Sequence, residues 1–167
     1  MAMKQSTAAK LLQDKILDKI LAQLLNLPNQ VQSQALAPGK WSPIQIMGHL
    51  IDSATYNSQR FIKAQWRDDL IFEAYPQKAL VDTQRFQESN WRDVIELWYW
   101  YNIHICHIIR HIPNNAWNKD REPHSMATEK AEVSLSDLVL DYVVHLEHHL
   151  QQIFPDYVRQ INPEQTQ

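Results

Sequence analysis

The sequence contains little glycine and almost no cysteine, with two glycines and one cysteine among 167 residues. Such a low glycine content disfavours a fold that is rich in tight turns. The single cysteine, Cys106, excludes an intramolecular disulfide framework and fits a reducing compartment. We therefore predict a cytoplasmic protein.

Neither sign of charge dominates the chain, and no segment is long and apolar enough to span a bilayer. The net charge is −3 with both signs mixed along the sequence, so no basic patch for nucleic acid or anionic lipid is visible. Charges at Lys10, Asp14 and Asp18 interrupt the apolar core that a signal peptide would need. We expect no nucleic-acid partner and no membrane partner.

Three common catalytic or binding motifs are also missing. The sequence has no Gly-x-Ser-x-Gly, no phosphate-binding loop and no paired-cysteine zinc motif. The length favours one domain over residues 1–167, long enough to bury a core of its own.

Apolar residues recur at helical spacing in four segments. The predicted helices run from about residue 6 to 26, from Ser42 to about Trp66, from Ser89 or Asn90 to just before Pro113, and from Ser134 to about Phe154.

Two of the helix starts carry strong capping signals. Ser42 with Pro43 and Gln45, and Ser134 with Asp137, are the residues of a capping box. Residues 67–89 show weak periodicity and form a long connection with some local structure. Together these features predict an all-α four-helix bundle with long connections.

Histidines stand out in the second and fourth predicted helices. His145 and His149 are four residues apart, so they project within about 40° of each other, whereas His148 points well away from the apolar arc. His49 lies at the border of the apolar face of its own helix, and packing these helices together would bring all three imidazoles into one partly wet cleft. Neutral imidazole binds zinc, nickel, copper and iron, and three ligands leave a coordination position open. Gln45, Asp52 and Asp141 are candidate hydrogen-bond partners that would orient the imidazoles.

A second histidine group lies on the third predicted helix. His104, His107 and His111 fall within about 60° of one another, and Trp100 shares their face. The deeper apolar arc is centred elsewhere, so this stripe is expected to face solvent or another subunit. That arc comprises Val94, Leu97, Trp98, Tyr101, Ile105 and Ile108.

The same helix carries two further expectations. Cys106 is predicted to point outward from the core arc and to be unreactive, because Arg110 is the one cation within a turn of it. Tyr99, Trp100 and Ile103 lie outside the arc, which predicts a homodimer that covers part of this surface.

Several short motifs occur in an order that resembles the DinB-like, or DinB/YfiT-like, superfamily of small four-helix bundles. They are Trp41-Ser42-Pro43, Gly48-His49-Leu50-Ile51-Asp52, the stretch from Asn57 to Phe61, and His145-x-x-x-His149 followed by Gln152-Ile153. The resemblance implies that His49, His145 and His149 match the metal-binding histidines of that superfamily. It also implies a divalent transition metal such as nickel or zinc, and a homodimer.

Some members of that superfamily are thiol S-transferases that join bacillithiol, mycothiol or glutathione to an electrophile. The leading hypothesis is therefore a metal-dependent transferase, in which the metal deprotonates a low-molecular-weight thiol cosubstrate that attacks an electrophilic small molecule. A metal-dependent hydrolase would use the same ligands. A stress-related binding or interaction bundle without catalytic activity is the alternative from a different class.

Overall fold

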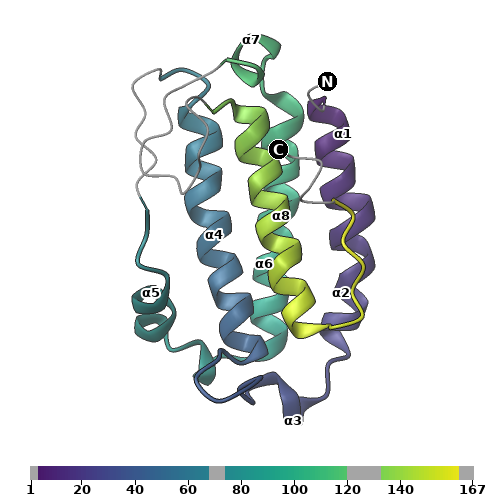
Figure 1. Cartoon of the computed structure of the whole chain (residues 1–167), viewed down its shortest axis with the longest axis vertical. Helices are drawn as coiled ribbons and strands as arrows, with labels where there is room; N and C mark the ends of the chain where they lie inside the picture. The colour runs from purple at the N-terminus through teal and green to yellow at the C-terminus, as the bar shows by residue number, and fades with distance from the viewer. Residues whose placement is uncertain (1–3, 68–73, 120–132, 162–167) are drawn as a thin grey trace.

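Four long helical segments make up the protein. The structure is a computed structural model that describes residues 4–67, 74–119 and 133–161, and these residues contain no strand. The first segment is continuous through α1 (Gln5–Lys10), the π-helix η1 (Leu11–Leu17) and α2 (Asp18–Leu25). The others are α4 (Pro43–Lys63), α6 (Trp91–His111) and α8 (Leu135–Ile153), and all four lie side by side (Figure 1). The predicted all-α four-helix bundle is confirmed.

Shorter helices lie in the connections. They are α3 (Asn29–Gln32), α5 (Gln77–Gln84), the 3-10 helix η2 (Phe86–Glu88) and α7 (Asn114–Trp117). The predicted long connection after α4 thus contains α5 and η2, although its residues 68–73 lie outside the described residues. No helix in the described ranges has both the length and the apolar content needed to cross a membrane.

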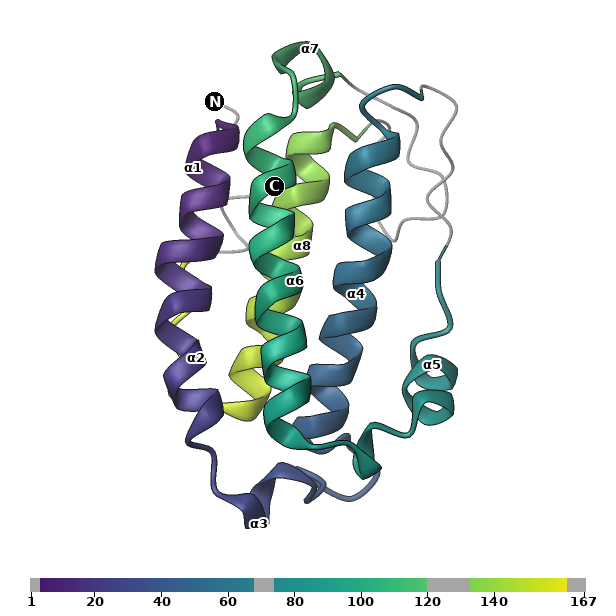
Figure 2. The same ribbon diagram turned by 180° about the vertical axis from the view of Figure 1, so that it is seen from behind.

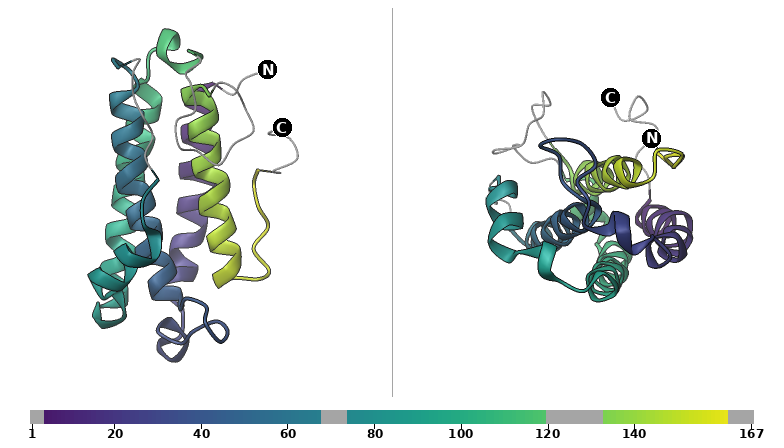
Figure 3. Two further views of the ribbon diagram at one scale, coloured as in Figure 1. Left: turned by 60° about the vertical axis from the view of Figure 1, so that its left-hand side comes forward. Right: turned by 90° about the horizontal axis from the view of Figure 1, so that it is seen from below.

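The long connection allows α4 and α6 to run in the same direction. Figure 2 shows the chain leaving the upper end of α4 and returning through α5 to the lower end of α6, while α2 and α8 run the opposite way. Viewed along the bundle, α5 lies outside the four packed helices (Figure 3). The hydroxyls of Ser58 on α4 and Tyr101 on α6 are 3.0 Å apart, so these two helices are in contact. α8 therefore runs antiparallel to α4.

The helix starts follow the predicted caps. The backbone N–H of Ser42 donates to Gln45 Oε1 at 3.0 Å, and that of Ser134 donates to Asp137 Oδ2 at 3.0 Å. Because these bonds satisfy backbone donors that a helix start leaves free, each fixes where its helix begins. At the other end, α4 stops at Lys63, three residues before the predicted Trp66.

The first helical segment contains a π-helix that the periodicity of the sequence does not reveal. Leu12, Ile16 and Leu17 are all fully buried in η1. The wider turn of a π-helix brings residues five apart onto one face, so Leu12 and Leu17 can both face the core.

The predicted core arc of α6 needs a correction. Leu97, assigned to the arc, has 53% of its surface exposed, whereas Cys106, predicted to point outward, is completely buried. The actual arc includes the buried Asn102, which donates to the Trp98 carbonyl at 2.8 Å. Because Asn102 is polar, the apolar residues alone indicated the wrong centre for the buried face of α6. A buried amide that has a hydrogen-bond partner can nevertheless be part of a core.

Gly48 allows η2 to pack closely against α4, next to His49. A Cβ atom placed at Gly48 would overlap the ring of Phe86, which is itself buried. Gly48→Ala should therefore destabilise the protein by about 1–3 kcal/mol through overpacking, measured by urea unfolding.

The control for this prediction is the same substitution in a Phe86→Ala background. Without the ring, alanine should stabilise α4 by up to about 1 kcal/mol relative to glycine, because its helix propensity is higher. A Gly48→Ala effect of the same sign in both backgrounds would contradict the proposed contact.

Candidate metal centre

His49, His145 and His149 meet between α4 and α8. His49 lies in the second turn of α4, and the other two lie on successive turns of the antiparallel α8. One ring nitrogen from each residue lies within 4.8 Å of those from the other two. The ring centroids are 5.1 Å apart for His49 and His145, 4.7 Å for His49 and His149, and 4.6 Å for His145 and His149. The structure therefore brings the three predicted residues together.

The spacing of the ring nitrogens suits a single ion. The Nε2 atoms of His49 and His145 are 3.2 Å apart. Two bonds of about 2.0–2.1 Å to one zinc ion, at about 90–110° to each other, separate their nitrogens by about 2.8–3.4 Å. All three nitrogens lie within 4.8 Å, so small side-chain rotations would complete the set.

All three imidazoles are neutral at neutral pH, which is the form that binds a metal. Burial, followed by the nearby His149, lowers the pKa of His49 to about 4. Burial and the neighbouring histidines lower the pKa of His145 to about 3. Burial also lowers the pKa of His149, against the opposing effect of its hydrogen bond with Gln152.

The three histidines differ in exposure, and the expectation that His49 is partly wet is wrong. His49 is completely buried, whereas His145 and His149 are half-buried. The ring of Trp41 lies 5.1 Å from that of His49 and the ring of Tyr75 lies 6.4 Å from it, centroid to centroid. These two rings lie beside the buried His49, whereas His145 and His149 keep part of their surface exposed. His148 is exposed, as predicted.

The hydrogen bonds of the cluster orient two imidazoles. Gln152 Oε1 lies 3.0 Å from His149 Nδ1, and Ser53 Oγ lies 3.5 Å from His145 Nδ1. A hydrogen bond at Nδ1 leaves Nε2 of the same ring available to bind an ion. Nδ1 of His49 is buried and has no hydrogen-bond partner in the described part of the chain, so ring packing holds this imidazole.

The partners predicted from sequence have other contacts. Gln45 caps α4, and Asp52 accepts a hydrogen bond from Gln84 at 2.8 Å. Asp141 lies near the guanidinium of Arg60, which partly opposes the rise that desolvation causes in the pKa of its carboxyl group. Gln152 could have been predicted from the sequence as a partner of His149, because a residue three positions later lies on the same side of the helix.

Tyr75 is a further polar residue beside the cluster, and it comes from the connection between α4 and α5. Its ring stacks on that of Tyr56 at 4.3 Å, and the guanidinium of Arg60 lies 6.0 Å from its centroid. Burial raises the pKa of Tyr75, and its hydrogen bond with Ser53 opposes this rise. The phenol is therefore protonated at neutral pH and can donate. The weak periodicity of this segment did not indicate that Tyr75 would lie beside the cluster.

The second histidine group does not form a comparable site. His104, His107 and His111 are exposed, as predicted, and the rings of His104 and His107 are 6.3 Å apart. Within the described ranges, the only group of three possible metal ligands is that of His49, His145 and His149. Burial raises the pKa of the Cys106 thiol to about 12, which agrees with its predicted lack of reactivity.

Fold and site together define a helical bundle with a cluster of three histidines between antiparallel helices. No family model matches the sequence, and no curated protein matches it. Among solved structures, the chain is similar to YfiT from Bacillus subtilis, described as a probable metal-dependent hydrolase with an unusual four-helix bundle topology. The match has a TM-score of 0.74 and 16% sequence identity, and it covers 92% of this chain and 87% of YfiT. The chain therefore has the YfiT fold, as the resemblance implied.

Proposed function

We propose that this protein is a metal-dependent hydrolase of a small molecule, with a divalent ion, zinc or nickel, held by His49, His145 and His149. The observation that carries the proposal is the 3.2 Å separation of two Nε2 atoms within a group of three neutral imidazoles. Three protein ligands leave a position open, as catalytic zinc sites do. The description of YfiT as a probable metal-dependent hydrolase supports the same class of reaction.

A divalent ion at this position would act as a Lewis acid and lower the pKa of a nucleophile that binds it. The chain supplies the rest of the site. Trp41 and Tyr75 cover His49 and exclude water from it. The phenol of Tyr75, which remains protonated, hydrogen-bonds with Ser53, whose hydroxyl also lies 3.5 Å from His145 Nδ1.

A thiol S-transferase with a low-molecular-weight thiol cosubstrate would use the same three ligands. We place hydrolysis first because water needs no dedicated thiol pocket and because YfiT is described as a hydrolase. The two reactions differ in what they consume, so one pair of assays separates them.

The test uses protein without a histidine tag, stripped with a chelator and reloaded with zinc or nickel. Hydrolysis of a panel of nitrophenyl esters and amides is measured beside thiol consumption with monochlorobimane and bacillithiol, mycothiol or glutathione. The proposal predicts hydrolysis that requires the metal and no enzyme-dependent loss of thiol. Thiol loss without hydrolysis would replace the hydrolase with the transferase. Inert protein under both assays would favour the binding bundle.

Gln152 should strengthen metal binding by orienting His149. Gln152→Ala removes the 3.0 Å contact with Nδ1 while keeping all three ligands, so metal affinity should fall about 10- to 100-fold. Competition with a chromogenic chelator measures it. Gln59→Ala, an exposed glutamine on α4, is the matched control and should leave the affinity unchanged. Equal affinities in the two variants would contradict this role.

We further propose that a second copy of the chain covers the outer face of α6. Trp100 and Leu97 have 64% and 53% of their surface exposed there, and together they form an apolar patch that a second copy can cover. Light scattering at micromolar concentration should report a dimer, and Trp100→Glu should report a monomer. A natural protein that is monomeric at this concentration would contradict the proposal.

A further inference from the structure

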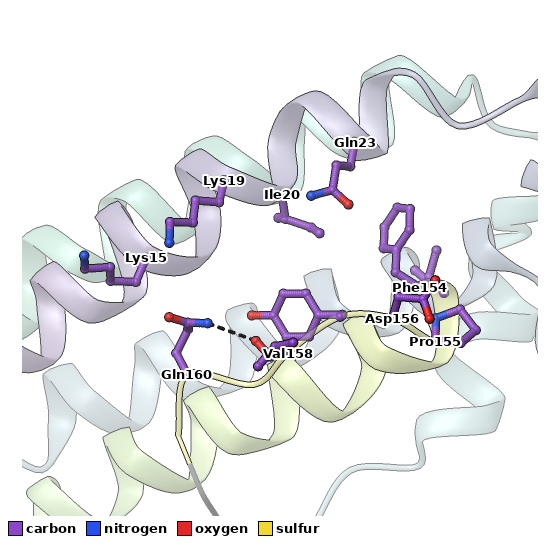
Figure 4. Close-up of a pocket in the computed structure, with 11 residues that line it drawn as sticks. Lys15, Lys19, Ile20, Gln23, Phe154, Pro155, Asp156, Val158 and Gln160 are labelled. Atoms are coloured by element: carbon purple, nitrogen blue, oxygen red, sulfur yellow. Dashed lines mark hydrogen bonds between the residues drawn. The ribbon is translucent and has the colours of Figure 1, made fainter.

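A pocket lies on the other side of α8 from α4, away from the histidine cluster. It has a volume of about 380 Å³ and lies between the first helical segment and the residues that follow α8 (Figure 4). Ligand sites in proteins usually measure about 300–1,000 Å³, so this pocket is large enough for a small molecule.

One wall of the pocket carries amino groups. Lys15 and Lys19 are one helical turn apart on η1 and α2, and Gln23 follows one turn later, so all three lie along the same side (Figure 4). Both lysines are exposed, and neither makes a hydrogen bond or ion pair with any residue that the structure describes. Their ammonium groups are available to a ligand.

Part of the pocket lining is apolar. Ile20 on α2 and Ile153 at the end of α8 are buried lining residues, and the half-buried ring of Phe154 points toward α2 (Figure 4). Asp156 is the one carboxylate among the lining residues. Two ammonium groups and one carboxylate give the lining a net charge of +1, which suits a single negative charge on an apolar body.

A buried carboxylate fixes the wall that follows α8. Glu147 is completely buried and accepts hydrogen bonds from the Tyr157 hydroxyl at 2.7 Å and from the backbone N–H groups of Gln160 at 2.6 Å and Ile161 at 3.0 Å. Hydrogen bonds to a charged acceptor are among the strong ones, so the wall is formed before a ligand arrives. A preformed pocket avoids the entropy cost of ordering its walls on binding.

We propose that this pocket binds a small organic carboxylate with an apolar, aromatic body. The carboxylate would lie between Lys15 and Lys19, where Gln23 can add a hydrogen bond, and the ring would lie on Ile20, Ile153 and Phe154. The single net charge of the lining, its apolar residues and the volume of the pocket together define this class of ligand.

The test uses naphthalene-2-carboxylate and the uncharged naphthalene-2-carboxamide, which have the same shape. Binding is measured by calorimetry with metal-free protein that carries His149→Ala, so that the carboxylate has no metal to bind. The carboxylate should bind more tightly than the amide, and its affinity should fall as salt rises. Lys15→Gln with Lys19→Gln should lower its affinity about tenfold or more by removing both ammonium groups.

Lys10→Gln with Lys40→Gln is the matched control, because it removes the same charge from exposed lysines outside the pocket. The affinity of this control variant for the carboxylate should lie within about twofold of that of the natural protein, since distant exposed charges are screened. The proposal is overturned if the carboxylate does not bind, if the amide binds equally well, or if both double variants lose affinity to the same extent.

Discussion

Replacing His149 by alanine should remove the metal from the protein and abolish metal-dependent hydrolysis. The substitution leaves His49 and His145, and two imidazoles hold a divalent ion too weakly to compete with buffer and chelator. His149 is half-buried at the side of the core, so the bundle should remain folded. Metal content by mass spectrometry, activity and the helical circular dichroism signal are measured on the same sample.

His148→Ala is the matched control, because this residue is adjacent in sequence but points about 100° away. His148 is exposed and contacts Gln152 and Arg159, with Gln152 Nε2 3.0 Å from its Nε2 and an Arg159 guanidinium nitrogen 3.2 Å from its Nδ1. The variant should keep its metal and its activity. Metal loss in the His148 variant together with metal retention in the His149 variant would show that the ligand assignment is wrong.

Acid should destabilise the metal-free protein well before its carboxylates are protonated. The folded-state pKa values of His49 and His145 are about 4 and about 3, below the ordinary value of 6.5. As pH falls below 6.5, the unfolded chain takes up protons that the folded chain cannot, so the free energy of unfolding decreases. The loss should continue to about pH 4 for His49 and about pH 3 for His145, at up to about 1.4 kcal/mol per pH unit for each histidine.

Urea unfolding of chelator-treated protein between pH 7 and 4 measures this dependence. His49→Gln should reduce the slope by about one proton, because the variant lacks one of the buried bases. Gln59→Ala, at an exposed position on α4 without an ionisable side chain, should leave the slope unchanged. A stability that stays constant from pH 6.5 to 4 would contradict the burial of neutral imidazoles.

The sequence was sufficient to predict the bundle and its three clustered histidines. Helical spacing marked the four long segments, and the capping residues Ser42, Asn90 and Ser134 marked where three of them begin. Once α4 and α8 were expected to pack together, the spacing of His145 and His149 and the position of His49 indicated one site. These predictions rest on helical spacing and capping residues, which are local features of the sequence. The structure agrees with them.

Features that depend on contacts between distant segments were not predictable in this way. One aromatic neighbour of His49 is Tyr75, 6.4 Å away between ring centroids, which a long connection brings back to α4. Cys106 and Leu97 were misplaced because the helical pattern cannot show that Asn102 finds partners inside the core, where Tyr142 donates to its side-chain oxygen. The π-helix likewise depends on how the first segment packs, since the same residues could form an ordinary helix.

The most direct test of the metal centre is the metal content and ligand environment of untagged protein. Elemental analysis combined with X-ray absorption spectroscopy should find one divalent ion per chain, bound by three imidazole nitrogens at about 2.0–2.1 Å if the ion is zinc. Protein that holds no stoichiometric ion after incubation with zinc or nickel, or an ion without imidazole ligands, would contradict the account.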